Sequence, residues 1–293
     1  MIGNNYKELQ QSHPCFAQGA AGNGGGRIHL PVSPACNIAC RFCERSVNTH
    51  EQRPGVTSTV LKPEETLQYI QKAIEACPEI HVVGIAGPGD TLATDAALDT
   101  FRLVKEAFPN LIKCMSTNGL RLAERADEVV EVGIDSLTVT VNAVDPEIEA
   151  KLNKYIIYNG KKIEGVEAAK ILIHNQIEGI RKVASAGTTV KVNTVLVPGI
   201  NDAHIEQIAK KVSEAGATIY NIIPLIPQFE LKDSRAPYCW EIDGARKQAE
   251  QYLDVFRHCQ HCRADAVGVP GVKEIGMQIY QRSLEIKENF SHG

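Results

Sequence analysis

Three cysteines lie close together near the start of the chain, at Cys36, Cys40 and Cys43, with the spacing C-x3-C-x2-C. Three thiols this close together are not accidental core cysteines of one strand or helix, and a wrapped loop can turn all of them toward one soft metal centre. Three ligands leave one iron of a four-iron cluster without a protein ligand. This cysteine triplet therefore predicts an iron–sulfur cluster with an open iron.

Two other kinds of cysteine site fit the triplet less well. A structural zinc site normally shows two pairs of ligands at finger-like spacing, and a disulfide framework normally has an even number of cysteines in a secreted chain. This chain has nine cysteines, and Met1–Gln11 is too polar for a signal peptide. Buried free thiols would account for Cys77 and Cys239, but not for the triplet.

At the triplet, the chain resembles the radical S-adenosylmethionine (SAM) superfamily. In that superfamily the open iron binds the amino and carboxylate groups of SAM, and an electron from the cluster breaks the sulfonium bond to release a deoxyadenosyl radical. An aromatic residue just before the last cysteine, here Phe42, belongs to the same pattern. The resemblance implies that the neighbourhood of Phe42 packs against the adenine of SAM.

Composition narrows the class of protein. The 293 residues suffice for one large α/β domain or two ordinary domains. A net charge of −4, a pI near 6.2 and the lack of a basic run point away from nucleic acid. No apolar run approaches the roughly twenty residues that cross a bilayer. We expect a cytoplasmic protein without a membrane partner, in which metal ligation explains most of the cysteines.

Six short β-rich runs alternate with helical segments, which predicts parallel strands joined by right-handed crossovers. The expected strands are 27–33, 80–86, 111–116, 136–141, 188–197 and 219–226. Six units favour an α/β fold with an open, partial (βα)6 barrel of the radical SAM type. Active-site groups should gather at the C-terminal ends of its strands.

The remaining segments are expected to be helices or extensions of one structural domain. The main helices are expected at 62–77, at 94–108, and from the turn at 117–119 on to 132. A long polar helical region is expected to reach about 186, and a further helix is expected at 203–215. Residues 1–26 should be a flexible, structureless lead, and 27–230 the barrel. The C-terminal extension, 231–293, should hold helices at about 244–258 and 272–289.

A glycine-rich turn ends the second expected strand, at Ala86-Gly87-Pro88-Gly89-Asp90. Glycines there let the backbone approach a ligand, and a carboxylate can receive its ammonium group. The turn looks like a variant of the superfamily's Gly-Gly-Glu motif, with Asp90 in place of Glu, which implies that it binds the amino group of SAM. Three more strand-end side chains could line the same pocket or bond their own loops: Thr140, Asn142 and Asn193.

Other cysteines and histidines have two readings each. Cys259 and Cys262 form a C-x2-C pair that can grip one metal or cluster edge, or act as a redox dithiol. Cys114, on the third strand, faces either the barrel interior or the core. His29, in the first strand, either bonds a carbonyl or binds iron. His13-Pro14-Cys15 lies in a tail where its thiol could be incidental.

Together these motifs resemble the NifB family of nitrogenase cofactor biosynthesis proteins. The resemblance spans residues 13 to about 268 and rests on the triplet, His13-Pro14-Cys15, Ala86–Asp90 and two further motifs: Glu51-x-Arg53-Pro54-Gly55 and Cys259-x-x-Cys262-Arg263-Ala264-Asp265-Ala266. Many family members carry an additional carrier-like C-terminal domain. This chain is expected to be a stand-alone form without it.

The resemblance implies an enzyme that fuses two four-iron precursor clusters and inserts a carbide from the methyl group of SAM, making the eight-iron core of the nitrogenase cofactor. Three [4Fe–4S] clusters and SAM would be bound in all. The implied roles are as follows: Cys15, His29 and Cys114 as ligands of the first precursor cluster; Cys259 and Cys262 as ligands of the second; and Glu51, Arg53 and Cys114 as catalytic groups.

The implied partners are iron–sulfur donor or scaffold proteins, an electron donor such as ferredoxin or flavodoxin, and a downstream cofactor carrier. Two other function classes share part of the pattern. A radical SAM enzyme that modifies a peptide or small molecule would share the triplet and the C-terminal pair, but would not require His13-Pro14-Cys15. A non-catalytic iron–sulfur carrier would share the cysteines but have no use for a SAM pocket.

Overall fold

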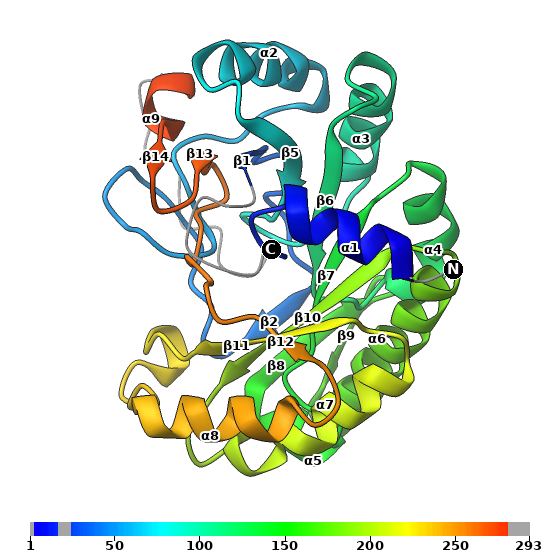
Figure 1. Cartoon of the computed structure of the whole chain (residues 1–293). Coiled ribbons are helices and arrows are strands. Elements are labelled where there is room, and N and C mark those ends of the chain that lie inside the picture. Colours follow the sequence, from blue (N-terminus) through cyan, green and yellow to red (C-terminus); the bar gives the residue numbers. More distant parts are fainter. Residues whose placement is uncertain (1–2, 17–24, 281–293) are drawn as a thin grey trace.

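The computed structural model describes residues 3–16 and 25–280. Its centre is one curved sheet with the strand order β12-β11-β10-β7-β6-β5-β1-β13-β14. All neighbours from β12 to β1 pair in parallel, and β13 and β14 add antiparallel strands beside β1. Figure 1 shows the helices arranged around the outside of this sheet.

The six predicted strands are confirmed. They are β1 (Gly26–His29), β5 (Ile80–Ile85), β6 (Ile112–Thr117), β7 (Ser136–Thr140), β10 (Thr189–Leu196) and β11 (Ile219–Pro224). The first ends earlier than predicted, because Pro31 has no N–H to continue the ladder. Within the described residues β12 (Asp254–Val255) and β14 (Lys273–Glu274) are the sheet's edges, so the partial, open barrel is confirmed.

Crossover helices pack on the outer face of the sheet through an apolar core. They are α2 (Thr66–Ala76), which follows the short 3-10 helix Pro63–Glu65, α3 (Ala96–Ala107), α4 (Leu122–Glu131), α6 (Gly165–Ser185) and α7 (Ile205–Glu214), which follows the 3-10 helix Asp202–His204. Outward-facing strand residues such as Val83, Met115 and Val139 are fully buried in this core. Burying this face leaves the alternate side chains of each strand for the inner side.

The long helical region predicted to reach residue 186 is wrong in its first half. The structure has a short helix, α5 (Pro146–Leu152), and then a hairpin of β8 (Asn153–Tyr158) and β9 (Lys161–Glu164) before α6. The two turn residues, Asn159 and Gly160, have φ of 50° and 71°, which suits the Asn-Gly hairpin turn. The β-branched and aromatic residues of β8 favour a strand over a helix.

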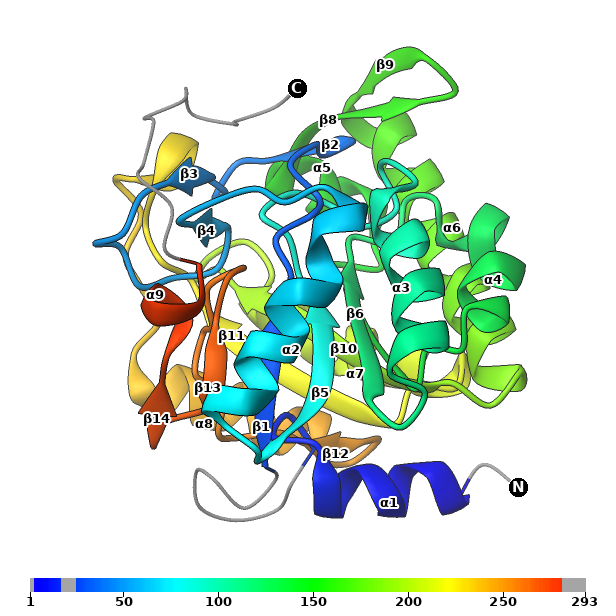
Figure 2. The same ribbon diagram turned by 90° about the horizontal axis from the view of Figure 1, so that it is seen from above.

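The prediction of a structureless N-terminal lead is wrong for residues 3–16, and residues 17–24 lie outside the described part. Gly3–Ser12 forms helix α1, and Leu9 and Phe16 pack against Ile219 and Phe256. Ile219 begins β11, so α1 lies against the N-terminal end of the sheet. Figure 2 shows α1 at the end opposite to β2 (Ile38–Cys40), which contains part of the triplet loop.

Both helices predicted near the C-terminus have different bounds. Helix α8 spans Cys239–Ala249, because Glu241 caps the amide of Tyr238, and the chain after it pairs as β12 with β11. In place of a helix from residue 272, a hairpin of β13 (Val267–Val269) and β14 precedes the short α9 (Gly276–Ile279). Residues 281–289 of that prediction lie outside the described residues.

Three small elements complete the described chain. β3 (Ser46–Val47) and β4 (Val56–Thr57) pair with each other after the triplet, and the 3-10 helix Phe229–Leu231 follows β11. Every helix among residues 3–16 and 25–280 is too short or too polar to cross a bilayer.

Candidate active site

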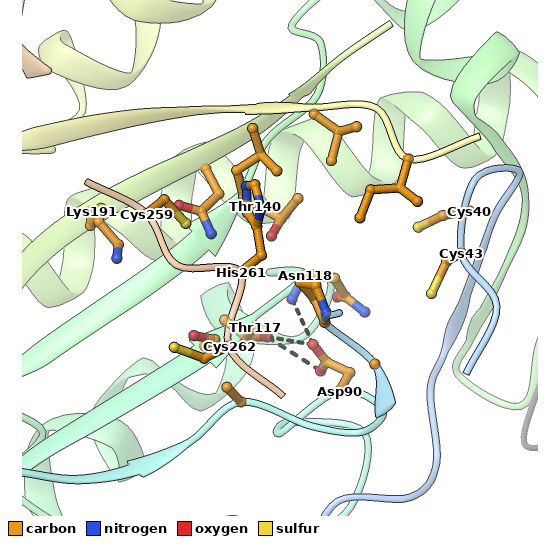
Figure 3. Close-up of a pocket in the computed structure, with 18 of the residues that line it drawn as sticks. Cys40, Cys43, Asp90, Thr117, Asn118, Thr140, Lys191, Cys259, His261 and Cys262 are labelled. Carbon is orange, nitrogen blue, oxygen red and sulfur yellow. Dashed lines mark hydrogen bonds between the residues drawn. The ribbon is translucent and has the colours of Figure 1, made fainter. Parts of the chain in front are cut away.

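A cavity of about 360 Å³ lies on the inner side of the sheet. Its walls include cysteines from distant parts of the sequence: the whole cysteine triplet, Cys15 from the N-terminal segment, and Cys259 and Cys262 from the C-terminal segment. Figure 3 shows Cys40 and Cys43 at one side of this space and Cys259 and Cys262 at the other. The fold thus brings both predicted sets of cysteines to one cavity.

The triplet loop is held by backbone pairing to the β8 strand. Ile38 pairs antiparallel with Ile156, and Cys40 with Asn153. The amide of Arg41 donates to the carbonyl of Leu152 at 2.8 Å. The hairpin that the sequence did not predict is therefore the support that fixes the triplet loop at the mouth of the barrel.

Burial makes the triplet thiols poor acids unless a cation is present. It raises the pKa of Cys36 to about 11, with the nearby Asp90 carboxylate adding to the rise, and it also raises the pKa values of Cys40 and Cys43. The buried guanidinium of Arg45 lowers the pKa values of all three thiols, but by less. Thiolates at this site need the positive charge of a metal centre, so these residues fit an iron–sulfur cluster.

The spacing of the sulfur ligands does not fit a single metal ion. Over the described ranges, 3–16 and 25–280, no three His, Cys, Asp or Glu side chains converge to hold one ion. A structural zinc site draws its thiolates to about 2.3 Å from one point. Six cysteines spread around one cavity suit a larger body such as a cluster.

The predicted carboxylate, Asp90, lines the cavity and is fully engaged by protein donors. It accepts hydrogen bonds from Thr117 Oγ1 (2.9 Å) and from the amides of Asn118 (2.6 Å) and Leu92 (3.0 Å), as Figure 3 shows for the first two. Burial raises its pKa despite these bonds. Asp90 thus positions Asn118, whose side-chain nitrogen Nδ2 lies 3.8 Å from the sulfur of Cys36. Its contact with an ammonium group stays a prediction.

The glycines of this turn let it approach the triplet loop. A Cβ on Gly89 would lie 2.0 Å from the carbonyl oxygen of Ala35, just before the triplet, and Gly87 has a φ of 129°. Asp90 N also donates to that Ala35 carbonyl at 2.8 Å. In this structure Gly89 provides close contact with the cysteine loop, and the predicted contact with SAM remains untested.

The other predicted pocket residues all line the cavity. They are Phe42, Thr140, Asn142 and Asn193. The two asparagine side chains bond neighbouring strands and not their own loops, since Asn142 Oδ1 accepts from the amide of Val195 (3.0 Å) and Asn193 Oδ1 from Asn221 Nδ2 (3.1 Å).

Four of the six cysteines outside the triplet surround one region of the inner face. We call Cys15, Cys114, Cys259 and Cys262 the inner cysteines. The pKa of Cys15 is raised to about 12, chiefly by burial and also by the other three cysteines, so each of these lies within electrostatic range of Cys15. Cys114 faces inward, because its neighbours Lys113 and Met115 are on the other face of β6. Cys15 lies near the N-terminal end of the sheet, beside Ile219 at the start of β11. The expectation that active-site groups gather at the C-terminal ends of the strands therefore holds for only part of the site.

His29 has the geometry of a metal ligand. Its Nδ1 lies 3.1 Å from the carbonyl oxygen of Arg263, so it carries the proton and leaves Nε2 as the free acceptor. Burial and the charge of Arg27 lower its pKa to about 4, which keeps the ring neutral. Gly84 provides the space for the ring, since a Cβ there would lie 2.8 Å from it.

His13 is engaged differently. Its Nδ1 accepts from the amide of Cys15 at 3.1 Å, and its Nε2 lies 3.4 Å from the hydroxyl of Ser136. Both ring nitrogens of His13 thus have protein partners, while the Nε2 of His29 has none among residues 3–16 and 25–280. The geometry favours His29 over His13 as an iron ligand.

Glu51 and Arg53 lie outside the cavity lining, in contrast to their predicted catalytic role. Glu51 accepts from Ser46 and Asn48 and pairs with Arg53 at 3.2 Å, and these contacts lower its pKa to about 2, with the Ser46 bond the largest cause. Arg53 also donates to the carbonyl of Glu44. The Glu51–Arg53 pair thus stabilises the loop after the triplet, and these contacts favour a role in positioning that loop.

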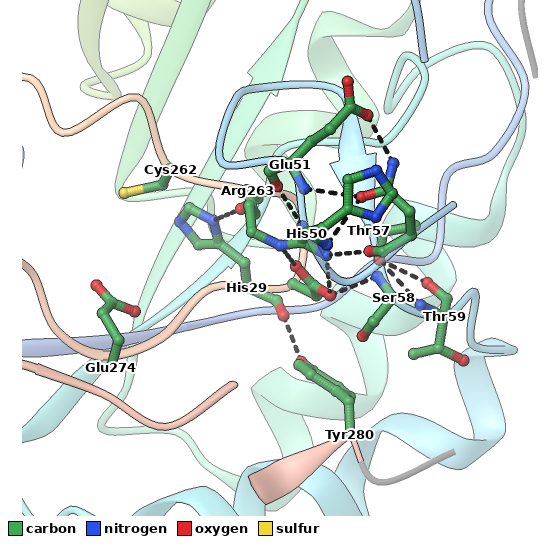
Figure 4. A network of polar contacts seen from close by, with 12 residues as sticks. His29, His50, Glu51, Thr57, Ser58, Thr59, Cys262, Arg263, Glu274 and Tyr280 are labelled. Atoms are coloured by element: carbon green, nitrogen blue, oxygen red, sulfur yellow. Dashed lines mark hydrogen bonds and ion pairs between the residues drawn. The ribbon is translucent and has the colours of Figure 1, made fainter. Parts of the chain in front are cut away.

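A buried ion pair joins that loop to the C-terminal cysteine segment. Arg263 contacts Asp265 at 2.8 Å and donates to the carbonyls of Asn48 and Glu51, while Asp265 accepts from the amide of Ser58 (Figure 4). Both charged side chains are less than a tenth exposed. This network positions Cys262, the residue just before Arg263.

Sequence reasoning missed several cavity residues. Lys191 and Arg27 bring buried positive charge, and Gln176 bridges the carbonyls of Asn118 and Thr140 at 2.8 Å each. Lys191 had a signal in the sequence, since it precedes Asn193 by two residues on one strand and so shares its face. Gln176 had none, because only the packing of α6 brings it to the strand ends.

The fold and this cavity define a radical SAM protein. Residues 30–212 match the Radical SAM superfamily, so the chain belongs to it. Among solved structures it is similar to a radical SAM methyltransferase from Sphaerobacter thermophilus (TM-score 0.54, 17% identity, 79% of this chain and 64% of that one) and to methylornithine synthase (0.55, 14%, 98% and 84%). These likenesses show the fold.

Within the superfamily the chain belongs to the NifB family. It is 46% identical to the FeMo cofactor biosynthesis protein NifB of Methanocaldococcus infernus, over 96% of this chain and 93% of that protein. The NifB of Methanocaldococcus jannaschii is 43% identical, over 98% and 97%. The NifB of Bradyrhizobium diazoefficiens is 40% identical, over 90% of this chain and 54% of that protein. Membership makes the chain a radical SAM enzyme of FeMo cofactor biosynthesis that uses a [4Fe–4S] cluster and SAM.

Proposed function

We propose that the enzyme fuses two [4Fe–4S] substrate clusters and inserts a carbide derived from SAM, producing the eight-iron precursor of the nitrogenase cofactor. The observation that carries the proposal is that the triplet and three of the inner cysteines line one cavity. When bound, the cluster on the triplet supplies the electron that cleaves SAM. A second set of sulfur ligands facing the same space has no use in SAM cleavage alone.

In this proposal different residues of the chain hold each of the three clusters. The triplet holds the third cluster, and Asp90, through Asn118, sets the loop around Cys36. Cys15, Cys114 and the free Nε2 of His29 hold the first substrate cluster, and Cys259 and Cys262 hold the second. An imidazole is a more labile iron ligand than a thiolate, which suits release of a finished product.

The proposal requires three kinds of partner: a donor or scaffold for the substrate clusters, an electron donor such as a ferredoxin or flavodoxin, and a carrier that receives the product. All nine cysteines lie in the described residues and none forms a disulfide. Free thiols in this number are typical of a reducing compartment, so we place the enzyme in the cytoplasm.

The test separates SAM chemistry from fusion. Anaerobically reconstituted protein should show three clusters by spectroscopic count, and Cys259→Ala with Cys262→Ala should keep SAM cleavage and methyl transfer but fail to activate cofactor-free nitrogenase. Cys15→Ala or Cys114→Ala should stop methyl transfer, measured as S-adenosylhomocysteine. A wild-type protein that holds only the triplet cluster would contradict the proposal.

A further inference from the structure

Lys191 is a buried lysine on the inner face of β10, and it lines the cavity. Its exposed fraction is 6%, and no carboxylate in the described part of the chain forms an ion pair with it. A buried charge without a partner is costly, since the cost of desolvating an ion in a protein interior is several kcal/mol. A lysine in this position therefore needs an anionic partner in the functional state.

The surroundings of the Lys191 ammonium are apolar and rich in thiols. Its Nζ lies 5.6 Å from the ring centroid of Phe16 and 5.6 Å from that of Phe256. Phe16 directly follows Cys15, and Phe256 lies three residues before Cys259. The Lys191 ammonium thus contacts two rings from opposite ends of the chain, one beside Cys15 and one close to Cys259.

All four inner cysteines lie within electrostatic range of this cation. Burial lowers the pKa of Lys191, but the charges of Cys15, Cys114, Cys259 and Cys262 outweigh burial, and the net shift is upward. Figure 3 shows Lys191 beside Cys259 on the same side of the cavity. A second cation, Arg27, donates to the sulfur of Cys262 at 3.4 Å but is already paired with Glu274 at 2.6 Å.

We infer that Lys191 is a positioning residue that holds the anionic, thiolate-ligated substrate clusters of both cysteine sets by its charge. This rests on the proposed function, because it assumes that the inner cysteines bind clusters. A cation shared by both sets favours the clusters' approach, since two anionic bodies in one low-dielectric cavity otherwise repel each other. Lys191 contacts neither the triplet nor its loop in the described structure, so SAM cleavage should not depend on it.

The test replaces the charge while keeping the long apolar stem, with Lys191→Met. The control is Lys113→Met, because Lys113 is also a buried strand lysine (7% exposed) but faces away from the cavity and lies 3.7 Å from Asp135. Each protein is reconstituted anaerobically with iron and sulfide. The readouts are iron per chain, reduction potentials of the clusters, and retention of iron against a chelator.

Lys191→Met should lose the iron in excess of the triplet cluster about tenfold faster than wild type, and any inner cluster that remains should have a more negative reduction potential, because a nearby positive charge favours the reduced form. Lys191→Arg should restore retention, and Lys113→Met should match wild type. Equal retention and potentials in Lys191→Met and wild type would overturn the inference while leaving the proposed function intact.

Two further outcomes keep the inferences apart. A wild type that binds iron only at the triplet would remove the proposed function itself. In the metal-free protein, Lys191→Met should still unfold cooperatively, because methionine keeps an apolar stem of similar length beside Phe16 and Phe256. A metal-free Lys191→Met protein that is unfolded would mean that Lys191 supports the fold, and would overturn the positioning role.

Discussion

Replacing Asp265 by Ala should destabilise the protein more than any change of a surface ion pair. The carboxylate is 4% exposed, binds the Arg263 guanidinium at 2.8 and 3.1 Å, and accepts from the amide of Ser58 at 2.5 Å. Its removal leaves a buried guanidinium without its counter-ion and a buried amide without an acceptor. Breaking one partner out of a buried pair costs about 3–5 kcal/mol.

That cost converts into a shift in melting temperature. Unfolding entropy near 2.1 cal/mol/K per residue gives roughly 0.6 kcal/mol per degree for a chain of this length, so the expected fall in Tm is about 5–8 °C. Asp265→Asn should fall less, because an amide oxygen can still accept from Ser58. The measurement is thermal unfolding by circular dichroism on the metal-free protein under reductant.

A matched control is Glu164→Ala, which removes one partner of the exposed Lys162–Glu164 pair on the β9 strand. Its Tm should equal that of wild type, since exposed pairs contribute little. If the Tm of Asp265→Ala equals that of this control within error, the network between the C-terminal cysteine segment and the loop after the triplet does not contribute the roughly 3–5 kcal/mol expected from breaking a buried pair.

Three other outcomes follow from the site. Replacing all three triplet cysteines by Ala should abolish SAM cleavage while other iron stays bound, and retained cleavage would remove the radical mechanism. With nitrogen-15 histidine labelling, hyperfine coupling to a reduced cluster should vanish in His29→Ala and persist in His13→Ala, and the reverse would make His13 the ligand. Burial raises the pKa of Glu149 to about 7 from 4.5, so the folded protein keeps a proton that the unfolded chain releases. The free energy of unfolding therefore falls as pH rises through 7. Glu149→Gln should reduce that loss by about 3 kcal/mol between pH 4.5 and pH 8 in denaturant titrations, and an unchanged pH profile would count against a buried protonated Glu149.

The sequence alone determined the local features of the fold and the chemistry of the triplet. Strands such as β6 and β10 were predictable because they are short β-rich runs between helical segments. The spacing of Cys36, Cys40 and Cys43 restricts the metal centre whatever the rest of the chain does. Local propensity also contained the Asn159-Gly160 turn, whose signal was overlooked in favour of a long helix.

Only the tertiary structure decided which distant residues share the cavity. The family resemblance favours His29 over His13 as a ligand. The structure adds that His29 Nδ1 lies within hydrogen-bonding distance of a carbonyl 234 residues away, while both ring nitrogens of His13 have protein partners. The Asp90 carboxylate proved to be bonded to the next strand's end. Lys191 became visible as a functional candidate once folding placed it between rings from both ends of the chain. Such contacts depend on how strands and helices pack, and sequence periodicity gives the face of a residue but not its partner across the cavity.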